Sequence, residues 1–419
     1  MRDTSNYDVE DRSDDNEDQL LSISQDEAKT KQRVWFGDLA DGWSSRKLKY
    51  VAGLRKEREI AFDSSLRYIG LENILSWSGS LNQTESVREG LASRFYVGDV
   101  LFGKLRPNLA KVYAAEFDGL CSTDALVLKP KAISAKYLLY SLISHPFIGL
   151  VSGSVYGAKM PRTSWDFIGQ QLVPLPDFAT QNRIVNFLDE KTAEIDAAIA
   201  KKRRLIELLK EQKAILINRA VTRGLNPDAP RKDSGIEWIG EIPAHWEVKR
   251  VKFLTALMSG DTITSDSFVD YGFPVYGGNG FRGYTTAFTH EGEFVLIGRQ
   301  GALCGNINYA SGKFFASEHA IVSIPKIRLW THWLGEVLRV ANLGLLSQSA
   351  AQPGISVEAV GNVFIPYPPL DEQEKLATLF CTSDEAYGEV VSHVENEIST
   401  LNEFKQTLIA NAVTGKIKV

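Results

Sequence analysis

The chain has 419 residues, 44% of them hydrophobic and 24% charged, which suits a globular protein with more than one domain. No uninterrupted apolar run approaches the roughly 18 residues of a membrane span, and the N-terminus lacks the apolar region of a signal peptide, so we expect a cytoplasmic protein. The three cysteines and six histidines are scattered, which predicts neither a disulfide framework nor a metal site.

The chain begins with an acidic head, assigned to residues 1–32. Its first 30 residues contain ten acidic and three basic side chains, a net charge of −7; because the whole chain carries −5, the rest carries +2. High charge with low hydrophobicity predicts a disordered, solvated tail. A nearly neutral body neither supports nor excludes binding to nucleic acid.

Residues 33–178 are expected to form a first mixed α/β domain. GDVLFGKLRPNLAKVYAA (98–115) and STDALVLKP (122–130) alternate apolar and polar residues, with Gly and Pro at turns, which is typical of strands. The turns also collect donors of the kind that contact phosphates and base edges. Any one of them is more often a solvated loop residue, so only their clustering favours DNA binding. The candidates are Lys104, Arg106, Asn108, Lys111, Tyr156, Lys159 and Arg162.

The phrase IGQQLVPLPDFATQNRI (168–184) leads into a predicted spacer helix at 179–225. Steps of four and three residues follow an a/d heptad seam along it, and Gly224 is placed to end the helix. The predicted seam consists of Ile184, Leu188, Lys191, Ile195, Ala198, Lys202, Leu205, Leu209, Gln212 and Leu216.

A linker at 226–250 precedes a second mixed α/β domain at 251–370. In the linker, WIGEIPAHW (238–246) repeats WFGDLADGW (35–43) at an offset of 203 residues. GEFVLIGRQGALCGNINYA (292–310) and SEHAIVSIP (317–325) predict strands, and YGGNGFRGYTT (276–286) predicts a glycine-rich loop. The candidate DNA-binding residues of this domain are Asn279, Arg282, Tyr284, Arg299, Gln300, Gln348 and Gln352.

The phrase VGNVFIPYPPLDEQEKL (360–376) repeats the one at 168–184 at an offset of 192 residues, and the match continues without a gap to AVT at 220–222 and 412–414. It opens a second predicted helix at 371–419, with Asp371 and Glu374 as a capping pair and Gly415 at the end. Its predicted seam consists of Leu376, Phe380, Ser383, Tyr387, Val390, Val394, Glu397, Leu401, Phe404 and Leu408.

Two long helices with matching apolar stripes need a partner to bury them. A coiled coil with an outside protein would serve, but two copies in one chain favour mutual, antiparallel pairing, which would place the variable domains at opposite ends of a rod. The expected fold is therefore α/β (α+β), with two mixed α/β recognition domains separated by two long antiparallel coiled-coil helices in a pseudo-twofold internal repeat.

Sequence patterns of catalysis are weak in this chain. PYPPL (366–370) lacks the leading residue of an amino-methyltransferase motif, and Asp177 with Glu211 and Lys213 imitates a nuclease motif, although the last two lie within a predicted helix. The sequence has no phosphate-binding loop and no glycine-rich dinucleotide turn. We therefore expect no catalytic residues and no metal ligands in this chain.

These features together resemble one family. GLNPDAPRKDSGIEWIGEIPAHWEVKRVK (224–252) resembles the linker of type I restriction-modification specificity subunits, and the doubled proline phrase followed by a long helix resembles their conserved regions. YGGNGFRGY and GRQGALCGN also resemble target-recognition domains of that family. The resemblance covers nearly the whole chain after the acidic head.

The resemblance implies a subunit that binds a bipartite site in double-stranded DNA, each recognition domain reading one half. It also implies a helical spacer that docks two modification subunits, which bind S-adenosylmethionine and methylate adenine, and restriction subunits driven by ATP and Mg. The chain itself would hold no cofactor. Two alternatives remain open: a standalone methyltransferase or nuclease with its own recognition domains, and a coiled-coil adaptor that does not bind DNA.

Overall fold

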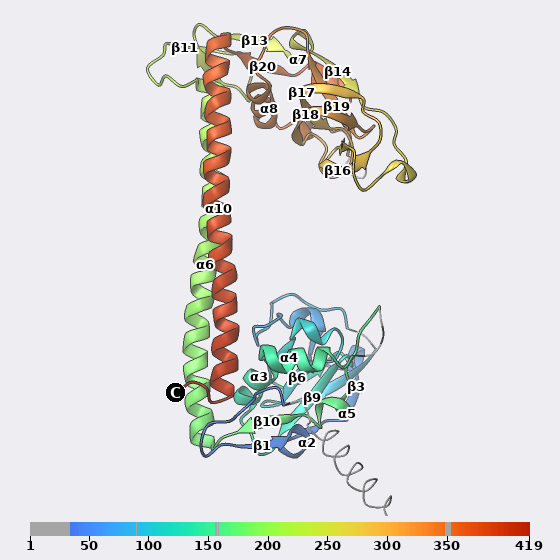
Figure 1. Cartoon of the computed structure of the whole chain (residues 1–419), viewed down its shortest axis with the longest axis vertical. Helices are drawn as coiled ribbons and strands as arrows, with labels where there is room; N and C mark the ends of the chain where they lie inside the picture. The colour runs from blue at the N-terminus through green and yellow to red at the C-terminus, as the bar shows by residue number, and fades with distance from the viewer. Residues whose placement is uncertain (1–33, 89, 156, 158, 348–352) are drawn as a thin grey trace, which may run out of the picture. The chain divides into compact units, whose positions relative to one another are not determined.

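The computed structural model describes residues 34–88, 90–155, 157, 159–347 and 353–419; the acidic head therefore lies outside the described residues. The chain divides into two compact units, residues 1–200 with 398–419, and residues 201–397. Each unit contains one α/β domain and a part of both long helices, α6 (Phe178–Arg223) and α10 (Leu370–Val413) (Figure 1). Within the described part, no helix is long and apolar enough to cross a membrane.

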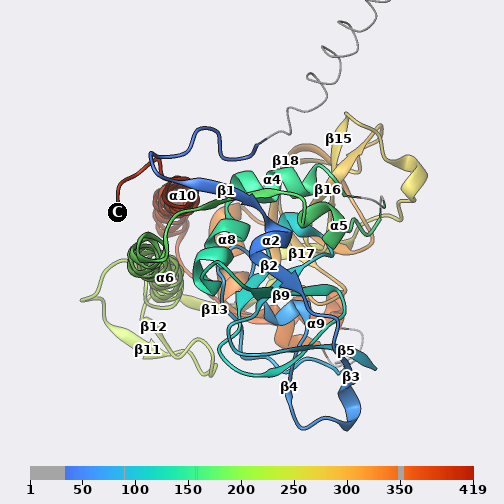
Figure 2. The same ribbon diagram turned by 90° about the horizontal axis from the view of Figure 1, so that it is seen from below.

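The two long helices run antiparallel, as the repeated stripes predict. In the second unit, Lys202 Nζ lies 2.6 Å from Glu397 Oε2 and Lys213 Nζ lies 2.8 Å from Asp384 Oδ1, so residue numbers rise along α6 while they fall along α10. In the first unit, the buried Lys405 ammonium binds both carboxylate oxygens of Asp196, at 2.8 and 2.7 Å. Seen end-on, α6 and α10 lie side by side (Figure 2).

The predicted seam of α6 is half correct. Leu188 and Ile195 are buried, but between them Thr192 faces the core in place of Lys191. Further along, Ile206 is partly buried while Leu205 is 43% exposed, and Gln212 is exposed. The helix therefore steps by four and then three residues from Leu188, where three and then four had been expected. Steps of four and three in either order return to the same face after seven residues, so only the packed partner decides between them.

The seam of α10 is predicted more accurately. Leu376, Phe380, Ser383 and Val394 are buried as expected. The prediction is wrong at Val390 and Phe404, which are 47% and 55% exposed, because the order of the steps changes there: the next residues, Val391 and Lys405, are partly buried and buried, and Lys405 binds Asp196 of α6.

The first α/β domain has two four-stranded sheets. In sheet order, one sheet consists of β2 (Ala52–Leu54), β9 (Ala125–Pro130), β6 (Val100–Gly103) and β7 (Val112–Ala114). Helix α3 (Ala135–Ile143) packs on β6 and β7 of this sheet, and α4 (His145–Ser152) follows α3 in the chain. The other sheet consists of β3 (Arg58–Ile60), β5 (Leu91–Phe95), β8 (Gly119–Cys121) and β4 (Arg67–Ile69).

The second α/β domain has one six-stranded sheet, and helix α8 (Thr331–Val340) packs on β17 and β18. In sheet order, its strands are β14 (Thr255–Ser259), β19 (Ala320–Pro325), β17 (His290–Gly298), β18 (Ile307–Ala316), β15 (Phe273–Gly277) and β16 (Gly280–Thr285). The strands expected at 98–115, 122–130, 292–310 and 317–325 are confirmed in both domains.

Both repeated phrases form one side of a short antiparallel ladder. In the first unit, β1 (Ser44–Lys47) pairs with β10 (Leu172–Leu175), and Ser44 lies opposite Leu175. In the second unit, β13 (Glu247–Arg250) pairs with β20 (Phe364–Tyr367), and Glu247 lies opposite Tyr367. These partners are related by the offsets 203 and 192, so the two separate sequence echoes belong to one repeated structural unit.

A buried glutamine explains why the same sequence recurs in both repeats. Gln181, 1% exposed, donates through Nε2 to Pro176 O at 2.9 Å and accepts from Ser134 N at 2.8 Å. Gln373, fully buried, donates to Pro368 O at 2.9 Å and accepts from the backbone of Trp330 at 3.3 Å. Since Ser134 and Trp330 directly precede α3 and α8, each glutamine ties the start of a long helix to the start of its domain's covering helix.

The helix ends confirm part of the prediction. Gly224 and Gly415 follow the two helices with φ of 70° and 73°, the left-handed conformation that favours glycine. The expected capping pair is wrong, because α10 begins at Leu370 and Asp371 is already helical. Glu372 instead accepts from the indole of the buried Trp246 at 2.9 Å.

Candidate nucleic-acid interface

Two nine-residue loops with unrelated sequences have the same backbone frame. Residues 103–111 (loop L1) follow β6, and residues 298–306 (loop L2) follow β17. Each loop is closed by a hydrogen bond between its ends, from Gly103 N to Lys111 O and from Gly298 N to Asn306 O, both 2.8 Å. The offset between the loops is 195 residues, and the strands that lead into them share it, since Gly103 lies opposite Ala125 and Gly298 opposite Ala320.

The backbone before the repeated phrase holds each loop in the same way. In the first domain, Arg106 N donates to Pro161 O at 2.8 Å, and Thr163 N donates to Lys104 O at 3.0 Å. In the second, Gly301 N donates to Pro353 O at 2.9 Å, and Ile355 N donates to Arg299 O at 3.0 Å. A third segment adds Lys104 N to Asp124 O at 2.9 Å and Arg299 N to His319 O at 2.8 Å. Equivalent sites on the frame therefore carry Lys104 and Arg299, Asp124 and His319, and Arg162 and Gly354.

In the first domain, this frame carries a charged cluster. Asp124 receives the Arg162 guanidinium at 3.2 and 3.3 Å, and Lys104 Nζ lies 3.8 Å from the same carboxylate. These two candidates are thus paired within the protein, which sets the direction of their side chains. Arg106, Asn108 and Lys159 are exposed.

Lys111 is separated from the other candidates. Its ammonium donates to the carbonyl of Leu71, and partial burial lowers the pKa of Lys111, with a smaller opposing effect from the Glu72 carboxylate. This hydrogen bond ties the side chain of Lys111, at the base of loop L1, to Leu71, and its role as a DNA contact stays a prediction.

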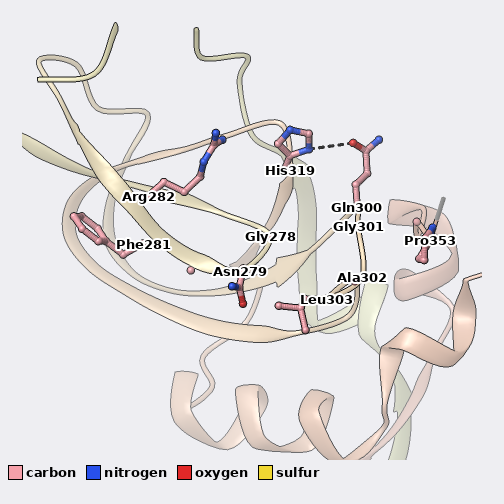
Figure 3. A pocket seen from close by; sticks show the side chains of 12 residues that line it. Gly278, Asn279, Phe281, Arg282, Gln300, Gly301, Ala302, Leu303, His319 and Pro353 are labelled. Atoms are coloured by element: carbon pink, nitrogen blue, oxygen red, sulfur yellow. Dashed lines mark hydrogen bonds between the residues drawn. The ribbon is translucent and has the colours of Figure 1, made fainter. Parts of the chain in front are cut away.

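In the second domain, the frame borders a cavity of about 1000 Å³. The cavity brings together three candidates, Asn279 and Arg282 from one hairpin and Gln300 from loop L2 (Figure 3). The Gln300 amide and the His319 imidazole also meet there, with Gln300 Oε1 3.0 Å from His319 Nδ1. The other residues that line the cavity are Gly278, Gly280, Phe281, Gly301, Ala302, Leu303, Pro353 and Gly354.

Exposed aromatic side chains adjoin this cavity. Phe281 is 54% exposed and its ring centroid lies 5.1 Å from that of Tyr284, which does not itself line the cavity. The Arg282 guanidinium lies over the ring of Phe268 at 5.6 Å. Polar donors next to exposed rings and a cationic group form a surface suited to base edges and phosphates.

Other candidates are not part of this cavity lining. Arg299 donates to Ser259 Oγ at 3.2 Å, and its side chain is partly buried. Tyr156, Gln348 and Gln352 lie outside the described residues.

Sequence reasoning missed Asp124, His319, Phe281 and Leu303. Asp124 and His319 precede the equivalent alanines of two strands that were expected, in STDALVLKP and SEHAIVSIP. Aligning those two segments would have shown that one position changes from carboxylate to imidazole. Phe281 and Leu303 carry no such signal, because single exposed apolar residues are common. The prediction of a glycine-rich loop at 276–286 is wrong: the segment forms the hairpin of β15 and β16, with Phe281 in β16, because the ladder partners, and not the glycines, decide its backbone.

The residues that resemble a nuclease motif in the sequence have structural roles. Asp177 accepts from Thr180 N at 2.9 Å and so caps α6, and Lys213, within α6, pairs with Asp384 of α10. Among the residues that the structure describes, no group of three or more His, Cys, Asp or Glu side chains is placed to hold a metal ion. PYPPL spans the end of β20 and the start of α10.

The chain thus has two α/β domains on a repeated helical scaffold, and each domain carries a loop rich in hydrogen-bond donors. This arrangement suggests a nucleic-acid-binding protein with two recognition domains, and comparisons with known proteins agree with that class. Residues 243–399 match the family model of the type I restriction modification DNA specificity domain. Over most of its length, the chain is similar to type I restriction-modification specificity subunits.

Particular relatives extend the match over most of the chain. The type I restriction enzyme MjaVIII specificity subunit of Methanocaldococcus jannaschii is 24% identical over 417 residues, which cover 89% of this chain and 91% of that protein. The EcoprrI specificity subunit of Escherichia coli is 34% identical over 128 residues, but this match spans only 29% of the chain and 32% of the relative. The match to the Escherichia coli EcoDI specificity subunit likewise spans less than half of that relative, 43%.

Solved structures share the fold. A chain from a structure on complex assembly and conformational transition of the type I R-M system is 20% identical, with a TM-score of 0.72, over 91% of this chain and all of that one. The HsdS subunit from Thermoanaerobacter tengcongensis, also 20% identical, has a TM-score of 0.50 over 91% and 98% of the two chains. At this identity the likeness concerns the fold alone.

Proposed function

We propose that this chain is the non-catalytic DNA-recognition subunit of a type I restriction-modification complex, and that its two α/β domains each read one half of a bipartite site. The observation that carries the proposal is the shared frame of loops L1 and L2, which presents different side chains from the same backbone. A constant backbone with variable donors is what two related readers of different sequences require.

The repeated parts support docking of one kind of partner in two copies. Tyr50 in α2 (Leu48–Val51) and Phe253 in α7 (Val251–Leu254) are 64% and 63% exposed, and they are related by the offset of 203. Each ring has the preceding lysine over it, Lys49 at 5.2 Å and Lys252 at 5.6 Å. Equivalent exposed aromatic groups, which are enriched at protein interfaces, suit two identical modification subunits.

The long helices add exposed apolar side chains that point away from their own seam. On α6, Leu208 is 45% exposed and Ile215 is 61% exposed, and Leu205 also lies outside the seam. These groups support binding of modification subunits and, with them, restriction subunits along the helices. In this proposal S-adenosylmethionine, ATP and Mg belong to the partner subunits, and this chain holds no cofactor.

The test is co-expression with the neighbouring modification subunit, followed by light scattering, methylation mapping and DNA binding at several salt concentrations. We expect two modification subunits per chain, methylation at a bipartite sequence, and an affinity that falls as salt rises. The chain alone should bind DNA weakly, since its body carries a charge of only +2.

The same experiment separates the alternatives. A chain that methylates or cleaves DNA without any partner is a standalone enzyme, and the proposal is then wrong. A complex without sequence-selective DNA affinity would favour a coiled-coil adaptor.

A further inference from the structure

Loops L1 and L2 share two left-handed backbone positions as well as their hydrogen bonds. Arg106 and Gly301 have φ of 49° and 87°, and Ala110 and Gly305 have φ of 46° and 84°. The second loop uses glycine at both positions, as the left-handed conformation favours. The first loop holds an arginine and an alanine in this conformation, which costs each of them conformational energy.

The alanine in loop L1 has a packing explanation. Ala110 is only 1% exposed, so its methyl group fills space in the core of the first domain. Its carbonyl also accepts a hydrogen bond from Trp77 N at 3.2 Å. At the equivalent position of the second domain, a Cβ on Gly305 would lie 2.2 Å from Gly344 N, which requires glycine.

Arg106 has no such explanation. Its side chain is exposed and makes no hydrogen bond or ion pair to any residue that the structure describes, while the neighbouring Lys104 and Arg162 both pair with the carboxylate of Asp124. Arg106 therefore occupies an unfavourable backbone conformation, while its side chain has no hydrogen-bond or ion-pair partner in the described part of the chain. Backbone strain of this kind concentrates at functional sites.

We propose that Arg106 is a specificity-determining residue that donates to O6 and N7 of a guanine in the half-site read by the first domain, and that loop L2 reads no base from the equivalent position because it has Gly301 there. This inference rests on the proposed function. The planar guanidinium matches the two acceptors that guanine presents in the major groove, and no other base pair presents that pair of acceptors from one base.

The frame also predicts that specificity can be moved from one loop to the other. A Cβ built on Gly301 meets no atom within 4 Å, so there is space for a side chain at this position, at the same kind of backbone cost that loop L1 bears at Arg106. Gly301 lines the cavity with Asn279 and Gln300, and an arginine introduced there would project from the surface that carries the other donors.

The experiment uses the full complex with modification subunits and a DNA library randomised in both half-sites. We compare the wild type, Arg106→Gly, Arg106→Lys, Gly301→Arg and the matched control Ala110→Gly, and thermal melting of each complex confirms folding. Ala110→Gly relieves the same kind of backbone strain in the same loop and leaves the guanidinium in place, so its base preferences should equal those of the wild type.

For Arg106→Gly we expect an unchanged or raised melting temperature, together with a loss of about 5- to 150-fold in preference for guanine at one position of one half-site. Arg106→Lys should recover only part of that preference, because lysine is a point charge without the planar pair of donors. Gly301→Arg should create a new guanine preference at one position of the other half-site.

Three outcomes overturn the inference. A uniform loss of affinity over all sequences, with a weaker salt dependence, would assign Arg106 to a phosphate. Unchanged base preferences in Arg106→Gly would leave the residue without a reading role, and a folded Gly301→Arg complex with no new preference would show that the two loops are not equivalent readers. If the wild-type complex itself selects no bipartite sequence, the proposed function fails rather than this assignment.

Discussion

The two α/β domains differ most in the side chains of loops L1 and L2, where their backbones are most alike. Four strands and the covering helix correspond between them, and loops L1 and L2 share end-to-end hydrogen bonds and left-handed positions. Yet the first loop carries an arginine beside an Asp124 charge cluster, and the second carries glycines around a cavity lined by amides. The frame is maintained by backbone hydrogen bonds, which do not depend on the side chains, so residues on it can change without loss of the fold.

The domains also differ in what is added to the common sheet. The first domain builds a separate four-stranded sheet, whereas the second extends the common sheet with β15 and β16. This hairpin supplies Asn279, Phe281 and Arg282 to the cavity beside loop L2. In the second domain an added element therefore provides donors that the first domain carries on the loop itself.

The largest expected effect comes from exchanging one whole reading surface. Replacing residues 255–355 with the matching segment of a relative should change the half-site read by the second domain completely and leave the other half-site unchanged. The segment runs from the start of β14 to the strand-like backbone that holds loop L2, so the frame is exchanged intact. Methylation mapping of cells with the chimera checks this, and altered preferences in both half-sites would show that the domains do not read independently.

A second prediction concerns the two buried glutamines, which occupy equivalent positions in the repeated sequence. Gln181→Ala and Gln373→Ala should each lower the free energy of unfolding by about 2–4 kcal/mol, because each leaves a buried prolyl carbonyl and a partly buried backbone N–H without a partner. Gln212→Ala, at an exposed position of α6, is the matched control and should change it by less than about 0.5 kcal/mol. Urea denaturation of the three variants tests whether the two halves respond alike; a loss confined to one half would break the equivalence.

A third prediction concerns the cavity of the second domain. Asn279→Ala and Arg282→Ala should each weaken DNA binding of the complex by about 1–3 kcal/mol, concentrated at particular base pairs of one half-site. Deleting residues 1–32 should have a smaller effect on base preference. Equilibrium binding to single-base variants of the site measures both; an equal loss at every base pair would indicate contact with phosphates instead.

The smallest effect is expected at a surface ion pair between the helices. Asp384→Ala removes the partner of Lys213, whose side chain is 31% exposed, and should cost about 0–1 kcal/mol. Asp196→Ala should cost more, because it leaves Lys405, only 7% exposed, without its partner. Thermal melting at low and high salt compares the two; equal losses would mean that burial of Lys405 does not matter.

The sequence by itself determined the repeat, the two long helices with their terminal glycines, and the strands within residues 98–130 and 292–325. These features depend on local patterns: apolar periods of two or of three and four residues, and glycine where a helix stops. It also placed Asn279, Arg282 and Gln300 among the candidates that the structure brings to one cavity.

Only the tertiary structure decided which of the candidate cations have partners within the described part of the chain. Lys111 is taken up by a carbonyl forty residues away, Lys104 and Arg162 are held by Asp124, and Arg106 alone among these four cations has no partner in the described part of the chain. The face of α6 that packs was likewise settled by α10, since Leu205 and Ile206 are equally apolar and only contact with the second helix distinguishes them. Side-chain pairing and helix-face choice depend on residues far apart in sequence, so a local pattern does not contain them.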